Sequence, residues 1–324
     1  MKEILYLISN SEKDLQFIDE ICQYTGLELK RLNQLDELLC LAELKDNYQI
    51  FVDIDFLSYF EGLTQVYLDL KKKYNYLLDS NSIHLMTSKE IGDLGFAMNA
   101  PFMGNLIFRN SLDFPGNGKK YGRILKSWMK GRSFGLDSII KPGETIRSFK
   151  LAYVSQKQAL LEALKTYLVS EGFQVRMAGV VTSALDELIM NAIYDAASKS
   201  NGEYLESELA GKLLKPLEDK STVEIHVHYD GEMLSVMVTD FYGSLDKLKL
   251  LNKILSSHFQ KELKIRPNQG GAGIGISSIL KMGGNLLFAC ESGKKTEATI
   301  FFRKTESFKE FKEQRFFIST RFYE

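Results

Sequence analysis

The sequence has few cysteines, no surplus of charge and no long apolar run. Its 324 residues include three cysteines, Cys22, Cys40 and Cys290, which form no CxxC pair and no cysteine–histidine cluster. Isolated thiols in an odd number exclude a disulfide scaffold and a structural zinc site, and they predict a reducing cytoplasm.

Charge and hydropathy exclude two further classes of partner. The 41 lysines and arginines balance 42 aspartates and glutamates, so the net charge is -1. This gives no basic surface for duplex DNA or for an anionic membrane. No apolar run reaches the roughly 18 residues that span a bilayer, and the acidic start is unlike a secretory signal. We therefore expect a cytoplasmic globular protein, whose length suits two domains.

The first 110 residues alternate between short apolar runs and amphipathic segments. The runs predict strands over residues 2–8, 27–32, 49–54, 82–86 and 105–108. The segments predict helices over residues 14–24 and 35–44. Such alternation predicts an α/β domain with a doubly wound parallel sheet over residues 1–112.

The pattern changes after a break rich in glycine and proline. Residues 113–149 are predicted to be a linker that holds one short helix over 121–130. Beyond it, two long helices over 156–170 and 180–198 precede four strands over 223–229, 233–239, 285–290 and 296–303. Residues 150–305 are therefore predicted to form an α/β sandwich with a mixed, mostly antiparallel sheet.

Residues 306–324 combine lysines and arginines with five phenylalanines. This composition predicts an extra helix and strand that pack on the preceding domain. Interleaved aromatic and cationic side chains are also typical of segments that bind single-stranded nucleic acid, or that dock on a protein.

Two polar residues share one face of the predicted helix over 180–198. Glu187 and Asn191 are four residues apart, which places them one helical turn from each other. The amide oxygen is a hard ligand suited to Mg²⁺, and the carboxylate could orient or deprotonate a hydroxyl. The same spacing also occurs in an ordinary solvated polar stripe.

Three further motifs follow in the same half of the chain. Asp240 ends a predicted strand, where a carboxylate either starts a turn or accepts a hydrogen bond from an exocyclic amine. Five of the seven residues 270–276 are glycine or alanine, and they lead into a helix, so their backbone suits either phosphate oxygens or a tight turn against a neighbouring strand. They form neither a P-loop nor a dinucleotide fingerprint. A short turn over 293–296 precedes the last strand of the sandwich.

The order of these four motifs resembles the GHKL ATPase family, which includes gyrase and the histidine kinases, over about residues 150–305. The anti-sigma-factor serine kinase branch is the most similar. The resemblance implies ATP and Mg²⁺ as cofactors and a lid over about 247–269. It implies Glu187 as catalytic base, Asn191 as Mg²⁺ ligand, Asp240 as adenine reader beside Gly243, glycines Gly271, Gly273 and Gly275 on the phosphates, and Thr296 in the adenine pocket.

The sequence departs from the family pattern in two places. Tyr242 and Ser244 stand where the family has glycines, with Gly243 between them, which alters the shape of the adenine pocket. Asp195 follows Asn191 by one turn, where the family often has histidine or lysine, so it adds negative charge near the phosphates unless Mg²⁺ or Lys199 compensates.

The four histidines argue against a sensor histidine kinase. None of His84, His226, His228 and His258 lies in a phospho-acceptor helix before Asn191. His226 and His228 alternate on one face of a predicted strand, with no obvious third ligand. They are therefore predicted to pack on the sheet and not to bind a metal.

Residues 1–112 resemble the receiver domains of response regulators. Asp53 ends the third predicted strand, at the place of the phospho-acceptor, and Thr87 stands where the switch hydroxyl would be. Ser9 and Asn10 replace the acidic pair that holds Mg²⁺ in that family, and Arg109 is the cation nearest to the place of its lysine. Because acyl-phosphate chemistry needs a divalent cation, we predict a pseudo-receiver that docks on a partner or dimerises.

The sequence is compatible with two functions. The first is an ATP-dependent kinase that phosphorylates a serine or threonine of a regulatory protein, such as a sigma-factor or anti-anti-sigma-like partner. The second is a non-catalytic module in which the bound nucleotide gates protein binding. In both, the receiver-like domain mediates docking or dimerisation, and neither function involves duplex DNA or a membrane.

Overall fold

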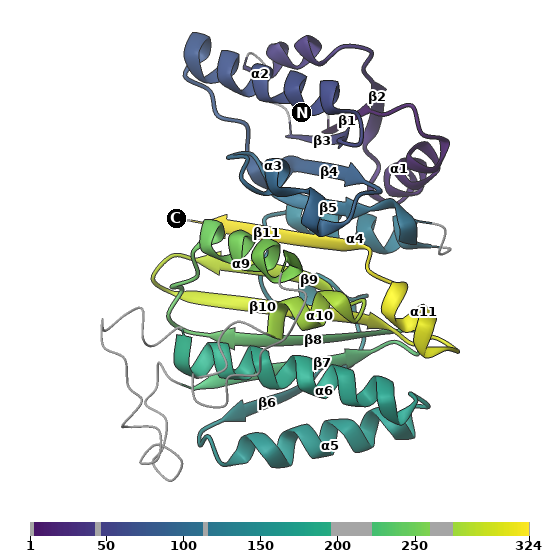
Figure 1. The fold of residues 1–324 in the computed structure, drawn as a ribbon, viewed down its shortest axis with the longest axis vertical. Helices are drawn as coiled ribbons and strands as arrows, with labels where there is room; N and C mark the ends of the chain where they lie inside the picture. Colours follow the sequence, from purple (N-terminus) through teal and green to yellow (C-terminus); the bar gives the residue numbers. More distant parts are fainter. Residues whose placement is uncertain (1–2, 43–46, 113–115, 196–221, 260–274, 324) are drawn as a thin grey trace. The chain divides into compact units, whose positions relative to one another are not determined.

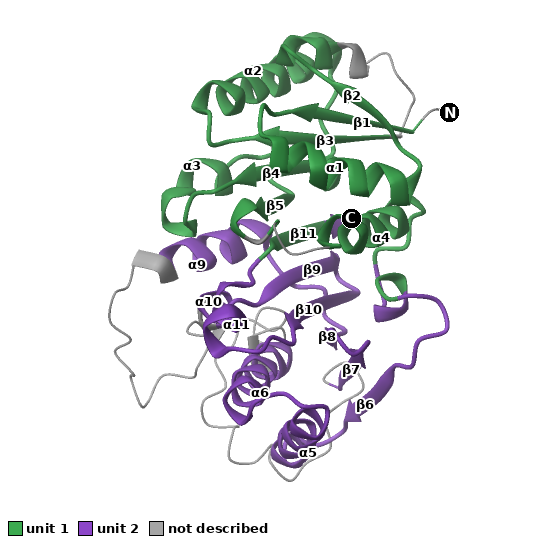
Figure 2. Ribbon diagram, turned by 90° about the vertical axis from the view of Figure 1, so that its right-hand side faces the viewer, with its two compact units in different colours: residues 1–133, 138–140, 316–321 green, residues 134–137, 141–315, 322–324 purple. Residues whose placement is uncertain are grey.

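The computed structural model describes residues 3–42, 47–112, 116–195, 222–259 and 275–323. They form an α/β protein whose strands are parallel in the N-terminal portion and antiparallel in the C-terminal portion, as predicted. Two compact units make up the chain (Figure 2): unit 1 contains residues 1–133, 138–140 and 316–321, and unit 2 contains 134–137, 141–315 and 322–324. Among the described residues, no helix is both long enough and apolar enough to cross a membrane.

Unit 1 is built on a parallel sheet. Its parallel strands are β1 (Glu3–Ile8), β2 (Glu28–Arg31), β3 (Asn47–Asp53), β4 (Ile83–Thr87) and β5 (Asn105–Phe108). They follow the order β2-β1-β3-β4-β5. All side chains of β4 and β5 are buried, as expected of parallel strands that are covered on both faces. This burial explains why their sequences are largely apolar and do not alternate with exposed polar residues.

The last strand of the chain returns to unit 1. Strand β11 (Phe317–Tyr323) pairs antiparallel with β5, with Phe317 opposite Ile107 and Ser319 opposite Asn105. The predicted extra helix is α11 (Phe308–Glu313), so a helix and a strand are both present in this segment. The strand, however, belongs mainly to unit 1 and not to the preceding domain on which it was predicted to pack. Phe316 packs edge-on against Phe17 at 5.6 Å between ring centroids. The phenylalanines of the tail therefore contribute to a hydrophobic core.

The described part of unit 1 contains four α-helices: α1 (Glu12–Thr25), α2 (Leu57–Tyr74), the short α3 (Gly95–Met98) and α4 (Asn117–Met129). Helix α2 was not predicted, although Leu63, Val66 and Leu70 give it a buried stripe. Residues 35–42 form a 3₁₀ helix and not the predicted α-helix. Helix α4 begins four residues before its predicted start, and it contacts α1 through Gly118 and Gly122, because a side chain at either glycine would meet α1.

Unit 2 contains an antiparallel sheet in the order β9-β10-β8-β7-β6. Its strands are β6 (Arg147–Leu151), β7 (Val223–Tyr229), β8 (Met233–Asp240), β9 (Asn285–Glu291) and β10 (Lys295–Arg303). A hairpin at Asp230 and Gly231 joins β7 to β8, with Gly231 at φ 91°. Strand β6 was missed because four of its five side chains are exposed, which leaves no apolar run to detect.

The helices of unit 2 include two long ones, α5 (Gln156–Ser170) and α6 (Val175–Met190), and two shorter ones, α9 (Lys247–Phe259) and α10 (Gly275–Lys281). Of these, α6, α9 and α10 contribute to the candidate site. Helix α6 contacts α5, α10 and strands β8 and β10, and Figure 1 shows α6 in front of the sheet, running in nearly the same direction as its strands. After Met190 the chain continues as one π-helical turn, Asn191–Asp195. This turn places Asn191 at the end of α6, beside the sheet.

Candidate functional site

A pocket of about 110 Å³ lies in unit 2 between helices α6, α9 and α10 and strands β8, β9 and β10. Its apolar lining includes Leu188, Ala192, Val238, Leu245, Leu250, Ile276, Phe288 and Ala298. Its polar lining consists of Asn191, Asp240, Ser244, Asp246, Lys249, Lys253 and Thr296. Mostly apolar walls with a few polar groups are typical of sites for small organic ligands.

Asp240 lies at the end of β8 and is 8% exposed. Its Oδ1 accepts hydrogen bonds from the backbone N–H groups of Tyr242 (3.0 Å) and Gly243 (3.4 Å). Asp240 therefore starts a turn, and it also lines the pocket. Thr296 of β10 is the register partner of Asp240, which explains how two distant positions meet at one end of the pocket.

Gly243 makes a close backbone approach beside this pocket. It has φ 58°, and a Cβ placed on it would lie 2.1 Å from the carbonyl oxygen of Glu291. Its own carbonyl accepts a hydrogen bond from the backbone of Gly293 at 3.1 Å. A glycine is thus required at position 243, where the turn after β8 contacts the turn between β9 and β10. Gly243 is not among the residues that line the pocket.

Glu187 and Asn191 lie on one face of the α6 helix, as their spacing predicts. The Asn191 side-chain amide donates to Oε1 of Glu187 at 3.4 Å. Asn191 lines the pocket, whereas the half-buried Glu187 stands one turn behind it. Asp195 belongs to the π-helical turn that follows, and its side chain lies outside the described part of the chain.

The predicted phosphate loop falls largely outside the described residues. Gly271 and Gly273 are not described, nor are Lys199 and the second half of the predicted lid, whereas Gly275 is the first residue of α10. The first half of that lid is helix α9. It places Lys249 and Lys253 on the pocket wall, and sequence reasoning did not single out these lysines although they stand one helical turn apart.

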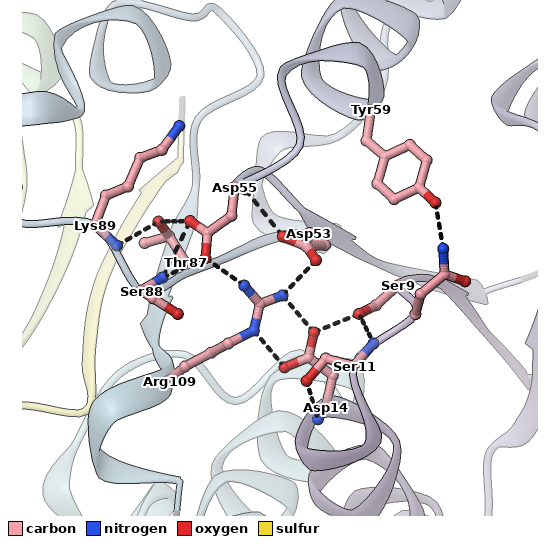
Figure 3. Close-up of polar contacts among 11 residues, drawn as sticks. Ser9, Ser11, Asp14, Asp53, Asp55, Tyr59, Thr87, Ser88, Lys89 and Arg109 are labelled. Atoms are coloured by element: carbon pink, nitrogen blue, oxygen red, sulfur yellow. Dashed lines mark hydrogen bonds and ion pairs between the residues drawn. The ribbon is translucent and has the colours of Figure 1, made fainter.

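A second polar cluster lies in unit 1, around the guanidinium of Arg109 (Figure 3). Arg109 follows β5 and binds Asp14 with two nitrogens, Nε to Oδ1 at 2.7 Å and Nη2 to Oδ2 at 2.5 Å. Nη2 also lies 2.9 Å from Oδ2 of Asp53, and Nη1 lies 2.6 Å from Oδ2 of Asp55. One guanidinium therefore contacts three carboxylates.

Neighbouring groups hold these carboxylates in place. The Ser9 hydroxyl donates to Asp14 at 2.5 Å, and the Thr87 hydroxyl donates to Asp55 at 2.5 Å. Burial raises the pKa of Asp53 above its ordinary value of 3.8, and the attraction of Arg109 offsets this only in part. Burial also acts on Asp55, but hydrogen bonds from Thr87 and the Ser88 backbone, together with Arg109, lower its pKa below 3.8.

The cluster contains more residues than the sequence had indicated. Asp53, Thr87, Ser9 and Arg109 meet there, as the resemblance to receivers implied, but Asp14 and Asp55 were not predicted. Asp14 reads in sequence as an ordinary acid in the first turn of a helix, so only the fold reveals its pairing with Arg109. The chain matches no protein-family model and no curated protein sequence.

Proposed function

We propose that unit 2 binds Mg²⁺-ATP in its pocket, in the manner of a GHKL ATP-binding domain. The observation that carries this proposal is the meeting of Asn191, Asp240 and Thr296 in one pocket. Each was selected from the sequence for a role toward the same ligand, and three separate elements bring them together. Their meeting supports the proposal independently of the undescribed glycine-rich segment.

The pocket offers suitable chemistry for each part of the nucleotide. Asp240 provides a buried carboxylate for the exocyclic amine of adenine, beside Thr296. The apolar side chains of Val238 and Phe288 provide walls for a purine ring. The amide oxygen of Asn191 is a suitable ligand for Mg²⁺, which offsets phosphate charge when bound, and the lysines of α9 supply further positive charge.

Glu187 supports a kinase as the activity of this site. Its carboxylate lies 3.4 Å from the Asn191 amide, so it stands one turn behind the ligand proposed for Mg²⁺. A carboxylate in this position can accept the proton of an attacking serine or threonine hydroxyl. The substrate would then be a regulatory protein, in a reaction like that of the anti-sigma-factor kinases.

The Arg109 cluster favours a pseudo-receiver as the role of unit 1. The strand order β2-β1-β3-β4-β5 is the flavodoxin-like order, which places Asp53 at the carboxyl edge of the sheet. The guanidinium of Arg109 already contacts Asp53, at the place of the phospho-acceptor, and the neighbouring Asp14. Docking on a partner or dimerisation is therefore the role we propose for this unit.

Calorimetric titration with Mg²⁺-ATP tests nucleotide binding. We expect the wild-type protein to bind, Asp240→Asn to lose about tenfold or more in affinity, and Asn191→Ala to lose the part of the affinity that depends on Mg²⁺. Glu224→Gln is the matched control, because Glu224 lies on the neighbouring strand β7 and does not line the pocket. Absence of wild-type binding at millimolar Mg²⁺-ATP would refute the proposal.

The variant Glu187→Gln distinguishes the kinase from the alternative, a non-catalytic module in which the nucleotide gates protein binding. In a kinase, this nearly isosteric change keeps ATP affinity and abolishes phosphate transfer. Both proteins would be used to capture partners from cell lysate, and transfer would be assayed on the captured material. Transfer by the wild type alone supports the kinase, whereas equal ATP-dependent capture without transfer supports the gated module.

A further inference from the structure

Three side chains with metal-binding atoms meet at the other end of the unit 2 sheet. The ligand atoms of Glu144, His228 and Asp230 all lie within 4.8 Å of one another. Glu144 precedes β6, His228 is near the end of β7, and Asp230 lies in the hairpin between β7 and β8. Since Asp240 ends β8, this cluster is separated from the candidate nucleotide pocket by the length of that strand.

The imidazole of His228 is oriented by two oxygen atoms. Its Nδ1 lies 3.0 Å from the backbone carbonyl oxygen of Thr145, and its Nε2 lies 2.9 Å from Oε2 of Glu144. A carbonyl oxygen only accepts, so Nδ1 carries a hydrogen. Nε2 is therefore the ring nitrogen that faces the carboxylate of Glu144. The ring is 5% exposed, so solvent has little access to it.

His84 shows the contrasting arrangement in unit 1. Its Nε2 faces Oε1 of Gln49 at 2.8 Å, and its Nδ1 faces the hydroxyl of Tyr121 at 2.8 Å. One acceptor and one hydroxyl satisfy a neutral ring completely, and burial lowers the pKa of His84 well below its usual range. His228 differs because both of its nitrogens face acceptors.

We propose that Glu144, His228 and Asp230 bind a divalent transition-metal ion, with Zn²⁺ as the best fit. Asp230 brings a second carboxylate to the point where Nε2 of His228 meets Glu144, so that three ligand atoms from separate positions converge. An imidazole nitrogen with two carboxylates is a ligand set that suits Zn²⁺, with water completing the coordination. The bond from Nδ1 to a backbone carbonyl is the outer-shell contact that usually orients a metal-binding histidine.

The two carboxylates are held by the backbone. The Lys141 backbone N–H donates to Oε2 of Glu144 at 3.1 Å, and Oδ1 of Asp230 accepts from the N–H groups of Glu232 (2.9 Å) and Met233 (2.6 Å). The Lys141 ammonium lies 3.6 Å from Oε1 of Glu144 and partly offsets its charge. The site therefore combines a rigid strand with a fixed turn, which limits the reorganisation needed to bind an ion.

Calorimetric titration of the chelator-treated full chain with Zn²⁺ tests this site, without nucleotide. We expect one equivalent to bind to the wild type, and His228→Gln and Asp230→Asn each to weaken binding at least tenfold. Asp230→Asn is the safer variant, because an asparagine oxygen can still accept the two turn hydrogen bonds. Circular dichroism would confirm that both variants are folded.

His226→Gln is the matched control. His226 lies two residues earlier on the same strand, and its Nδ1 faces the hydroxyl of Ser148 at 2.9 Å. The His226→Gln variant should bind Zn²⁺ as the wild type does. Absence of stoichiometric binding to the wild type, or equal binding by Asp230→Asn and the wild type, would overturn the proposal. Neither result bears on ATP, so this site and the proposed nucleotide site can fail separately.

Discussion

Asp53 and Asp240 occupy the same local position in the two units, yet their surroundings differ. Each ends a strand, is buried, and accepts a turn hydrogen bond at Oδ1, from the Asp55 N–H at 2.9 Å and the Tyr242 N–H at 3.0 Å respectively. Asp53 faces the guanidinium of Arg109, whereas Asp240 lines a pocket. A carboxylate at a strand end is therefore not a site by itself; the neighbouring charges and space decide its role.

The two units offset the charge of their buried carboxylates in different ways. In unit 1 the chain supplies the cation itself, through a side chain that cannot lose its proton at physiological pH. In unit 2 the proposed ligand would bring Mg²⁺ with it.

Replacing Arg109 should produce the largest effect. Arg109→Met leaves the carboxylates of Asp14, Asp53 and Asp55 without their shared counter-ion, which should cost about 3–5 kcal/mol in the free energy of unfolding at neutral pH. Urea denaturation would measure the loss. Arg147→Met is the control, because Arg147 stacks on the ring of Tyr167 at an exposed site, and such a contact is worth about 1 kcal/mol or less.

The same variant can show whether the guanidinium takes the place of a metal. Millimolar Mg²⁺ should raise the melting temperature of Arg109→Met and leave that of the wild type unchanged. If the two proteins are equally stable without Mg²⁺, the cluster is not the electrostatic anchor that its geometry indicates.

Acetyl phosphate should not modify the wild-type protein. Phosphorylation of Asp53 would require Mg²⁺ and a phosphoryl group where Arg109 now contacts the carboxylate. Intact mass spectrometry after incubation with acetyl phosphate and Mg²⁺ should therefore show the unmodified mass alone. A phosphorylated species that disappears in Asp53→Asn would mean that unit 1 is a working receiver.

The smallest effect should be a difference in pH dependence between two neighbouring aspartates. The folded-state pKa of Asp53 is raised, so its contribution to stability is present below 3.8 and is lost as pH rises through the raised value. The folded-state pKa of Asp55 is lowered, so its contribution is present above 3.8 and is lost as pH falls through the lowered value.

The two asparagine variants should therefore diverge in opposite directions. Relative to the wild type, Asp53→Asn should gain stability as pH rises from 3 to 7, whereas Asp55→Asn should lose stability over the same range. Denaturation at several pH values would measure both curves. Parallel curves would show that the two carboxylates share one environment, contrary to their different contacts.

Local patterns in the sequence predicted most strands and the long helices α5 and α6, because burial on one or both faces leaves a clear hydrophobic period. They also identified Asn191 and Asp240, each of which stands at a distinctive point of its element. They could not pair Asp14 with Arg109, or Glu144 with His228, because each pair joins positions far apart in the chain. Such pairings depend on strand order and register, which local periodicity does not encode.

The pairing of β11 with β5 has a consequence for synthesis. About 210 residues separate the two strands, and at 5–20 residues per second a ribosome needs roughly 10–40 s to make them. During that interval the parallel strands of unit 1 are complete, while the hydrogen-bonding edge of β5 waits for its partner. An open edge can pair with another nascent chain. The position of β11 in the sequence thus sets how long the edge of β5 waits for this strand during synthesis.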